Sequence, residues 1–459
     1  MQPVAQILAE FSANLTYDGI PPEVITTARN RFLDTLGICL ACHKEPFARA
    51  VSGPLLDMGG RAESTAVGLG VRLPAASAAL FNGTVAHGPD FDDTHTESIV
   101  HTSAVVVSTA LAVGEAVGAT GREVLTAAVV GWETITRIGA AAPGKFHRRG
   151  LHATGVCGAL AAALIAGKLL KLDAPRLTAA LGISGSQASG LFEYLADGSW
   201  VKRLHPGWAA HGGIMAAYFA KGGFTGPNTV LDGRFGFYNT LLGPGEADFS
   251  RLVRGLGREW ETLRICYKPY PCCHYNHAFM DSIRALMDAG LRAEAVERVV
   301  CRISDQQIPI VCEPVAAKLA PRTDYEAKFS LMFCVAAMLS DGRVGIDTFA
   351  EDKIRDPRYL ELASRVSYEV DPDSVFPHTF PGWVMVTTRD GRVLEHRTRV
   401  NKGSPENPMS SAEIREKFMA NARIGGAGDR VAPICEQVDR LAEASNLTSL
   451  MSLCGGEKQ

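Results

Sequence analysis

The chain has 459 residues and a mass of 49.0 kDa, with 46% hydrophobic and 21% charged residues. The 46 Lys and Arg residues nearly balance the 49 Asp and Glu residues, so the formal net charge is -3 and the pI about 6.5. These proportions are typical of a globular protein, and the length predicts two or three domains of roughly 150 residues. A near-neutral chain has no basic field to attract phosphates, so we expect no nucleic-acid partner.

Neither an export signal nor a membrane span is expected. The N-terminal stretch MQPVAQILAEFSANL has no basic segment followed by an apolar one. The most apolar stretch, 156–166, stops before Lys168 and is shorter than the roughly 20 residues that a spanning helix needs. The 11 cysteines are an odd number and scattered, which indicates reduced thiols. We therefore predict a soluble, cytoplasmic protein.

The first half of the chain is predicted to be helical. Pro22 begins a segment whose apolar residues recur every three or four positions as far as Leu40. Long runs of small and apolar residues with few polar interruptions indicate further helices, buried inside a bundle. These runs are 103–117, 121–138, 154–172 and 207–221. We find no alternation typical of strands before about residue 290.

The second half changes character. Short segments rich in β-branched residues predict strands at 296–303, 365–370, 383–388 and 392–400, the last two joined by the turn Arg389-Asp390-Gly391. Helices are expected at 325–339, 346–351, 410–419 and 432–444. The simplest arrangement is a mainly α protein. A large all-helical domain, 1–265 plus 403–459, would carry a smaller α+β domain inserted at 266–402.

The richest chemical motif is HGPDFDDTH, residues 87–95, followed by His101. It places three carboxylates, three imidazoles and a hydroxyl within fifteen residues. The segment could be a solvated loop whose Asp and Thr residues cap the next helix. It could also hold a divalent metal, although it lacks a recognised ligand spacing. The third interpretation is a site in which imidazoles and carboxylates transfer a proton.

Three further motifs contain candidate residues. RGLHATG, 149–155, precedes an Ala-rich helix, and its glycines would let a carboxylate approach the helix N-terminus. KRLHPGW, 202–208, puts two cations at a helix start, which opposes the helix dipole and suggests an anionic partner. KPYPCCHYNH, 268–277, lies at the domain boundary, and its adjacent cysteines do not fit the usual zinc spacing. A structural histidine, a surface basic pair and an extended crossing segment are the plainer alternatives.

Together with YEAKFSL and GSPENPMS, these motifs resemble the MmgE/PrpD family, in order along nearly the whole chain. Members include 2-methylcitrate dehydratase, cis-aconitate decarboxylase and iminodisuccinate epimerase. The resemblance implies a large helical domain built from both ends of the chain and a smaller α+β lid domain. It also implies a homodimer that uses neither a metal nor an organic cofactor.

The resemblance also implies the site residues. Its catalytic positions correspond to Asp90, Thr94, His101, His152 and Lys202, and its substrate-binding positions to Arg203, Lys268, Cys273, His277 and Phe333. The family's tyrosine after the K-F-S motif is Phe333 here, a residue that cannot donate a proton. A decarboxylase mechanism that uses this phenol is therefore in question.

The family's reactions share the making or breaking of a C–H bond next to a carboxylate. We accordingly expect metal-independent acid/base chemistry on a small di- or tricarboxylate, of the dehydration or epimerisation type. His101 and His152 would exchange protons, Asp90 would orient a histidine, and the cations would bind substrate carboxylates. A cis-aconitate-type decarboxylase, a non-catalytic carboxylate-binding protein and a metal-dependent enzyme are the alternatives.

Overall fold

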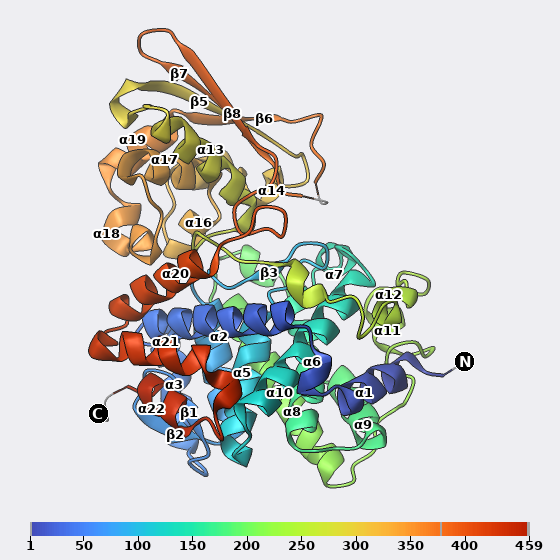
Figure 1. Ribbon diagram of the computed structural model, residues 1–459. Helices are drawn as coiled ribbons and strands as arrows, with labels where there is room; N and C mark the ends of the chain where they lie inside the picture. The colour runs from blue at the N-terminus through green and yellow to red at the C-terminus, as the bar shows by residue number, and fades with distance from the viewer. Residues whose placement is uncertain (1, 377–378, 457–459) are drawn as a thin grey trace. The chain divides into compact units, whose positions relative to one another are not determined.

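The computed structural model describes residues 2–376 and 379–456, and the chain forms two compact units. The larger unit contains Met1–Gly88, Asp92–Ile265 and Ser410–Gln459. The smaller unit contains Pro89–Phe91 and Cys266–Met409. Helices dominate the chain (Figure 1), as the sequence predicts. Among the described residues, every helix is too short or too polar to cross a lipid bilayer.

The larger unit is a bundle of helices with a few very short strands. Its helices are α1 (Val4–Asn14), α2 (Pro22–Cys42), α3 (Pro46–Met58), α4 (Ala75–His87), α5 (Ser103–Val117), α6 (Gly121–Ala140), α7 (Lys145–Arg148), α8 (Ala153–Leu169), α9 (Ala174–Gly185), α10 (Val201–Lys221), α11 (Phe237–Leu241), α12 (Ser250–Val253), α20 (Ser411–Ile424), α21 (Val431–Asp439) and α22 (Thr448–Cys454). The short strands are β1 (Ser64–Ala66), β2 (Val71–Leu73) and β3 (Thr94–His95). A fourth, β4 (Ile265–Cys266), contains the last residue of the larger unit's segment Asp92–Ile265 and the first of the smaller unit's segment Cys266–Met409.

Most of the helix predictions are confirmed. The helix expected at 103–117 is α5, and those expected at 121–138 and 154–172 are α6 and α8 with ends moved by one to three residues. Helix α10 begins six residues earlier than predicted. Proline inside a helix usually ends it, yet Pro206 lies within α10. Among the described residues, four strands occur before residue 290, where we find no alternation in the sequence, because two- and three-residue strands are too short to show it.

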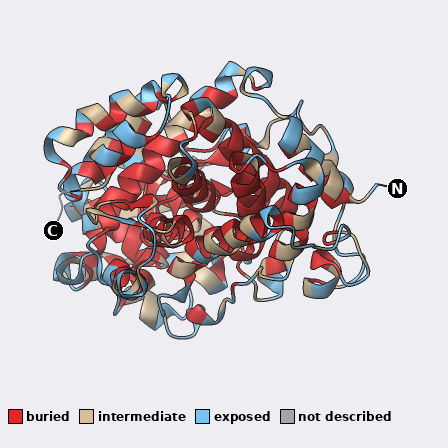
Figure 2. Ribbon diagram, turned by 90° about the horizontal axis from the view of Figure 1, so that it is seen from below, coloured by how far each residue is buried: buried red, intermediate tan, exposed pale blue. Residues whose placement is uncertain are grey.

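The centre of the larger unit is almost free of solvent (Figure 2). Every residue of α8 except Lys168 is buried, and so is nearly all of α6. Such helices show no apolar stripe, because every face packs against another helix. The predicted burial of these segments is therefore confirmed.

Two glycines let α4 and α10 approach closely. A Cβ on Gly207 would lie 2.1 Å from the carbonyl oxygen of Leu80 and 2.6 Å from Thr84 Oγ1. A Cβ on Gly83 would lie 2.8 Å from Gly207 Cα. The contact brings the C-terminal end of α4 near the N-terminal turns of α10, where several candidate site residues lie.

Replacing Gly207 with Ala is expected to lower the free energy of unfolding by about 1–3 kcal/mol, because a methyl group in this contact overpacks the core. Urea denaturation would measure the loss. Gly212 is the matched control on the same helix, since the nearest atom to its Cβ would be Gln187 Oε1 at 3.5 Å. Gly212→Ala should leave stability unchanged or raise it. Equal losses in the two variants would contradict the packing argument.

The smaller unit packs helices on a mixed sheet. Its strands are β5 (Val296–Ile303), β6 (Val366–Val370), β7 (Gly382–Thr388) and β8 (Val393–Thr398), in the order β6-β5-β7-β8. Strand β5 pairs parallel with β6 and antiparallel with β7, and β7 pairs antiparallel with β8 as the predicted hairpin. The longer helices α13 (His277–Asp288), α17 (Leu331–Asp341) and α19 (Pro357–Ser364) contact one another and the sheet, and they lie on one of its faces (Figure 1).

The remaining helices of this unit are short: α14 (Ile308–Val311), α15 (Val315–Leu319), α16 (Asp324–Lys328) and α18 (Glu351–Ile354). The prediction of a single helix at 325–339 was wrong in its continuity. It is divided into α16 and α17, because Ser330 is extended and its side chain accepts a hydrogen bond from the Phe333 amide as the N-cap of α17. The predicted helix at 346–351 is a short 3₁₀ turn followed by α18.

Candidate active site

Three imidazoles converge inside the larger unit. His87 is the last residue of α4, His101 lies just before α5, and His152 is the N-cap of α8. The ring centres of His87 and His101 are 4.7 Å apart, and those of His87 and His152 are 5.5 Å apart. One nitrogen of each ring lies within 4.8 Å of the others, which is close enough for the three to share a ligand or a metal ion.

Asp92 contacts two of these histidines. Its Oδ2 lies 2.8 Å from His87 Nδ1, and its Oδ1 lies 3.5 Å from His101 Nδ1. Burial is the largest influence on His87 and lowers its pKa to about 4, although the Asp92 carboxylate opposes the shift. Burial alone would raise the pKa of Asp92, but the two imidazoles outweigh it and hold that pKa below its usual range. At neutral pH a charged Asp92 therefore accepts a hydrogen bond from a neutral His87.

The other imidazoles have partners of their own. His152 Nδ1 lies 3.0 Å from Nδ1 of His205 on α10, and the Thr94 hydroxyl lies 3.3 Å from His101 Nδ1. Lys202, in the first turn of α10, is buried. Burial first, and then the neighbouring imidazoles and the Lys202 ammonium, lowers the pKa of His152 well below its usual value and that of His205 to about 4. His87, His152 and His205 are thus neutral imidazoles beside one buried cation, Lys202.

Asp93, adjacent to Asp92, has a different role. It forms a buried ion pair with Arg31 of α2, with Nη1 and Oδ2 2.6 Å apart. Its other oxygen accepts hydrogen bonds from the amides of Thr102 and Ser103 at the start of α5. The Arg31 guanidinium also donates to the carbonyl of Ile265. Asp93 therefore holds the fold beneath the cluster.

In the smaller unit, Asp90 pairs with Lys268. Lys268 Nζ lies 2.9 Å from Asp90 Oδ1 and 3.0 Å from its carbonyl oxygen, and both residues are buried. Asp90 has a φ of 58°, a conformation that a residue with a Cβ adopts only when its surroundings impose it. Lys328 Nζ donates to the carbonyl of Pro89 at 3.1 Å. Two buried lysines thus fix the segment that carries Asp90.

The remaining residues predicted in the smaller unit lie in or beside its core. Burial raises the pKa of Cys273 to about 12, so its thiol stays protonated. His277 begins α13, and its Nε2 lies 3.3 Å from the carbonyl of Cys272. Phe333 is fully buried, with its ring packed against Phe349 and Tyr359.

Arg203 follows Lys202 on α10 but packs against aromatic rings. Its guanidinium carbon lies 4.6 Å from the ring centre of Phe47 and 6.0 Å from that of Trp200. An arginine stacked in this way is held partly by cation–π attraction. Its role as a substrate contact stays a prediction.

The structure therefore gathers four predicted residues, Thr94, His101, His152 and Lys202, in the larger unit, and pairs Asp90 with Lys268 in the smaller. It adds His87, Asp92, His205 and Lys328, which the sequence analysis did not single out. All four occur in the quoted motifs HGPDFDDTH, KRLHPGW and YEAKFSL. The motifs therefore contained these four residues, but the sequence did not indicate which residues of each motif to select.

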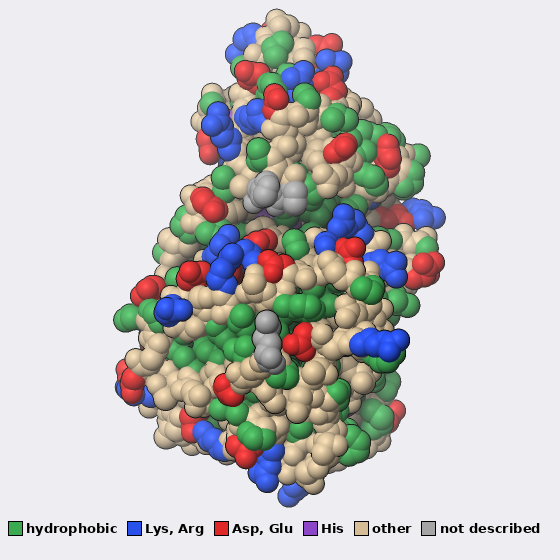
Figure 3. All heavy atoms as spheres, turned by 90° about the vertical axis from the view of Figure 1, so that its right-hand side faces the viewer, with side chains coloured by type: hydrophobic (Ala, Val, Ile, Leu, Met, Phe, Trp, Pro, Cys, Tyr) green, Lys and Arg blue, Asp and Glu red, His purple; other side chains and the backbone are tan. Residues whose placement is uncertain are grey.

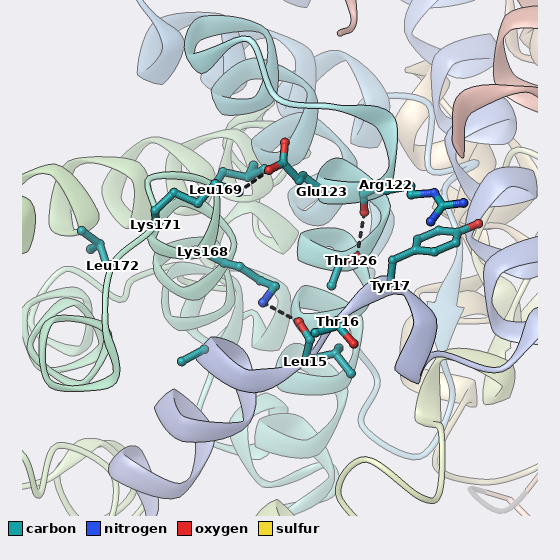
Figure 4. A pocket seen from close by; sticks show the side chains of 11 residues that line it. Leu15, Thr16, Tyr17, Arg122, Glu123, Thr126, Lys168, Leu169, Lys171 and Leu172 are labelled. Carbon is teal, nitrogen blue, oxygen red and sulfur yellow. Dashed lines mark hydrogen bonds and ion pairs between the residues drawn. The ribbon is translucent and has the colours of Figure 1, made fainter. Parts of the chain in front are cut away.

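A pocket of about 380 Å³ elsewhere in the larger unit shares no residue with the histidine cluster (Figure 4). Lys168 projects into it from α8, and its Nζ donates to the carbonyls of Ser12 and Leu15 at the end of α1. A cation at a helix C-terminus satisfies carbonyls that have no partner in the helix. Lys171 forms an ion pair with Glu123 beside it. These polar groups hold α1 in place, so we do not regard the pocket as the active site.

Acid is expected to destabilise the protein well above the pH at which carboxylates titrate. His87 and His205 have folded pKa values of about 4, and His152 is shifted in the same direction, whereas unfolded histidine titrates near 6.5. Between pH 6.5 and 5 the unfolded chain binds more protons, so stability is full above pH 6.5 and falls as the pH is lowered.

Urea denaturation at several pH values would measure this effect. An uptake of two to three protons corresponds to a loss of about 3–4 kcal/mol per pH unit. His205→Gln should reduce the uptake by about one proton. A free energy of unfolding that is constant from pH 7 to pH 5 would contradict neutral burial of these imidazoles.

The surface is mixed in charge. On the face shown in Figure 3, acidic and basic side chains of the larger unit are interspersed among hydrophobic ones. All eleven cysteines are buried, and the structure pairs none of them in a disulfide.

Comparison with known proteins identifies the family. The MmgE/PrpD N-terminal domain profile matches residues 6–250, and the C-terminal domain profile matches residues 270–440. The chain belongs to the MmgE/PrpD family. The resemblance found in the motifs is thereby confirmed over most of the chain.

Relatives of this MmgE/PrpD chain include proteins named as cis-aconitate decarboxylases. A cis-aconitate decarboxylase of Aspergillus terreus is 27% identical over 98% of this chain and 96% of its own length. The human cis-aconitate decarboxylase is 29% identical over 84% of this chain and 80% of its own length. The cis-aconitate decarboxylase-like protein oryM of Aspergillus oryzae is 26% identical over 98% of this chain and 97% of its own length.

Proposed function

We propose that this protein is a lyase that removes a carboxyl group from a small unsaturated tricarboxylate, with cis-aconitate as the first substrate to test. The convergence of His87, His101 and His152 beside Asp92 and Lys202 is the observation that carries the proposal. The names of its relatives support the choice of decarboxylation over the broader acid/base chemistry expected from the motifs.

The cluster suits the chemistry. Decarboxylation breaks a C–CO₂⁻ bond, leaves an electron pair on carbon and consumes one proton. A cation such as Lys202 stabilises the negative charge that develops next to the remaining carboxylates. His101, whose Nδ1 lies 3.5 Å from Asp92 Oδ1, would carry the proton to carbon, with the carboxylate orienting its ring. His152 and Thr94 would position the substrate.

We also propose that the cations and polar groups of the other motifs bind substrate carboxylates. Lys268 is the strongest of these, since an ammonium group paired with Asp90 is already desolvated and fixed. Arg203, Cys273, His277 and Phe333 remain predicted substrate contacts. The proposed reaction needs no metal and no organic cofactor.

Dehydration or epimerisation is the second candidate. His87 is oriented by Asp92 and His152 by His205, so two imidazoles are held independently within 5.5 Å of each other. An epimerase needs two such groups on opposite faces of the reacting carbon, and a dehydratase needs a base and an acid.

The test is to incubate EDTA-treated protein in D₂O with cis-aconitate, 2-methylcitrate or iminodisuccinate and to follow the substrate by proton NMR. Loss of a carboxyl group with deuterium entering the product would support decarboxylation. Deuterium exchange or loss of water without CO₂ release would favour the second candidate. A rise in melting temperature with ligand but no turnover would indicate a non-catalytic binding protein.

The site assignment is tested with Lys202→Met and His152→Gln, each expected to lower kcat at least about 100-fold. Lys221→Met is the matched control, because Lys221 is an exposed lysine at the other end of the same helix. Full activity in both Lys202→Met and His152→Gln would overturn the assignment.

We propose that the protein is a homodimer formed through the outer face of α10. Val201, Trp208 and Phe219 are 44%, 47% and 43% exposed, and their spacing of seven and eleven residues places them on one face of the helix. The half-buried Leu204 and Met215 lie on the same face. A continuous apolar stripe of this kind marks a protein interface.

Trp208→Glu is expected to raise the dimer dissociation constant at least about 30-fold, because it places a charge in the middle of the apolar stripe. Sedimentation equilibrium would measure the constant. Val393→Glu, an exposed apolar residue on β8, is the control and should leave the dimer intact. A wild-type monomer, or a Trp208→Glu dimer of unchanged affinity, would contradict the proposal.

A further inference from the structure

The three imidazoles of the site resemble a metal centre in their geometry. They lie at or beside the ends of three separate helices, they form a largely buried cluster, and one nitrogen from each lies within 4.8 Å of the other two. Three histidines arranged in this way are a known ligand set for zinc. Uncharged nitrogen donors favour zinc, cobalt and copper over magnesium and calcium, which prefer oxygen.

The groups around the rings strengthen the likeness. His87 Nδ1 is held by Asp92, His152 Nδ1 by His205, and His101 Nδ1 by Thr94. Ligating histidines in metal sites are oriented in the same way, through a hydrogen bond on the ring nitrogen that does not bind the metal. The other nitrogen of His87, Nε2, is buried and has no hydrogen-bond partner among the described residues.

We propose that His87, His101 and His152 bind one transition-metal cation, Zn²⁺ or Co²⁺, and that the bound ion blocks the enzyme. Zinc–nitrogen bonds of 2.0–2.1 Å require the three nitrogens to lie about 3.4 Å apart. The rings must therefore close by roughly an ångström, a change that side-chain rotation supplies. The inhibitory effect rests on the proposed function, because the ion would occupy the imidazole nitrogens that the reaction needs. The binding itself does not depend on that function.

Neighbouring charges set the affinity. The buried Asp92 carboxylate favours a cation in the cluster, whereas the Lys202 ammonium opposes it. Lys202→Met should therefore tighten metal binding several-fold even though it lowers activity. That opposite pair of effects distinguishes a metal site in the cluster from a metal bound elsewhere.

The experiment titrates EDTA-stripped protein with Co²⁺ and records the visible absorption of four-coordinate cobalt. We expect one ion per chain, and a Kd raised at least about 100-fold in His87→Gln and His152→Gln. Asp92→Asn should raise it about 10–100-fold, the usual effect of losing the group behind a ligand. His396→Gln, on β8, is the histidine control and should bind as the wild type does. Circular dichroism melting establishes that each variant folds.

Absence of the cobalt bands in the wild type would overturn the site, as would bands that survive in His87→Gln and His152→Gln. Zn²⁺ is then added to the decarboxylation assay, where it should inhibit and EDTA should restore activity. If the protein binds cobalt but Zn²⁺ does not inhibit the reaction, the proposal that the bound ion blocks the enzyme would be overturned. A protein that binds cobalt but turns over none of the polycarboxylates would instead contradict the proposed function.

Discussion

Asp92→Asn is expected to lower kcat by about 10²–10⁴-fold while the protein remains folded. The Asp92 carboxylate lies 2.8 Å from His87 Nδ1 and 3.5 Å from His101 Nδ1. An amide can donate a hydrogen bond to Nδ1 and so select the other tautomer of the ring, which places the proton on the wrong nitrogen. It also removes the negative charge that stabilises an imidazolium. Steady-state kinetics with the substrate found in the NMR experiment would measure the loss.

Two readouts separate this effect from general damage. The melting temperature of Asp92→Asn should fall far less than that of a variant which breaks a buried ion pair. Its pH–rate profile should lose the limb that reports an imidazole in contact with Asp92. The substitution removes the carboxylate charge that acts on that imidazole. A kcat within a factor of three of the wild type would contradict a role for Asp92 in the reaction.

Asp93→Asn, one residue further along, is expected to give the converse result. The free energy of unfolding should fall by about 3–5 kcal/mol, because the substitution leaves the buried Arg31 guanidinium without its counter-charge. The helix start at Thr102 and Ser103 would also lose a charged acceptor. Denaturant unfolding measures the change, and kcat per folded molecule should stay within a few-fold of the wild type.

The double variant Arg31→Met/Asp93→Leu provides the control for this prediction. Replacing both partners with apolar residues removes the unpaired charge, so the double variant should be less destabilised than Asp93→Asn alone. A double variant that loses as much stability as the sum of the single ones would contradict a coupled buried pair.

The three acidic residues of HGPDFDDTH show how far sequence could predict the site. The motif predicted a site in this segment, but not which partner each carboxylate would have. Asp90 pairs with Lys268, Asp92 with His87, and Asp93 with Arg31. Neighbouring side chains of a non-helical segment point in different directions, and their partners lie up to 178 residues away in the sequence. Sequence separation of that size carries no information about contact.

The fold was predicted best where the chain is most regular. The helix 103–117 matches α5 because small and apolar residues fill it without interruption, and strand 296–303 matches β5 for its β-branched residues. The errors fall where local rules are overridden. Pro206 did not end α10, and Ser330 divided a helix that apolar periodicity had joined. In both places side-chain packing or a capping hydrogen bond outweighs local propensity.

The close contact of α4 with α10 links the packing of the interior to the position of the proposed site. His87 ends one helix, and Lys202 and His205 begin the other, while Gly83 and Gly207 set the spacing between them. A change of core volume there would displace an imidazole and an ammonium group together. For protein engineering, this means that substitutions chosen to stabilise this pair of helices cannot be judged by melting temperature alone. Each must also be assayed for turnover, because the contact that sets the spacing of the two helices also sets the positions of the proposed site residues.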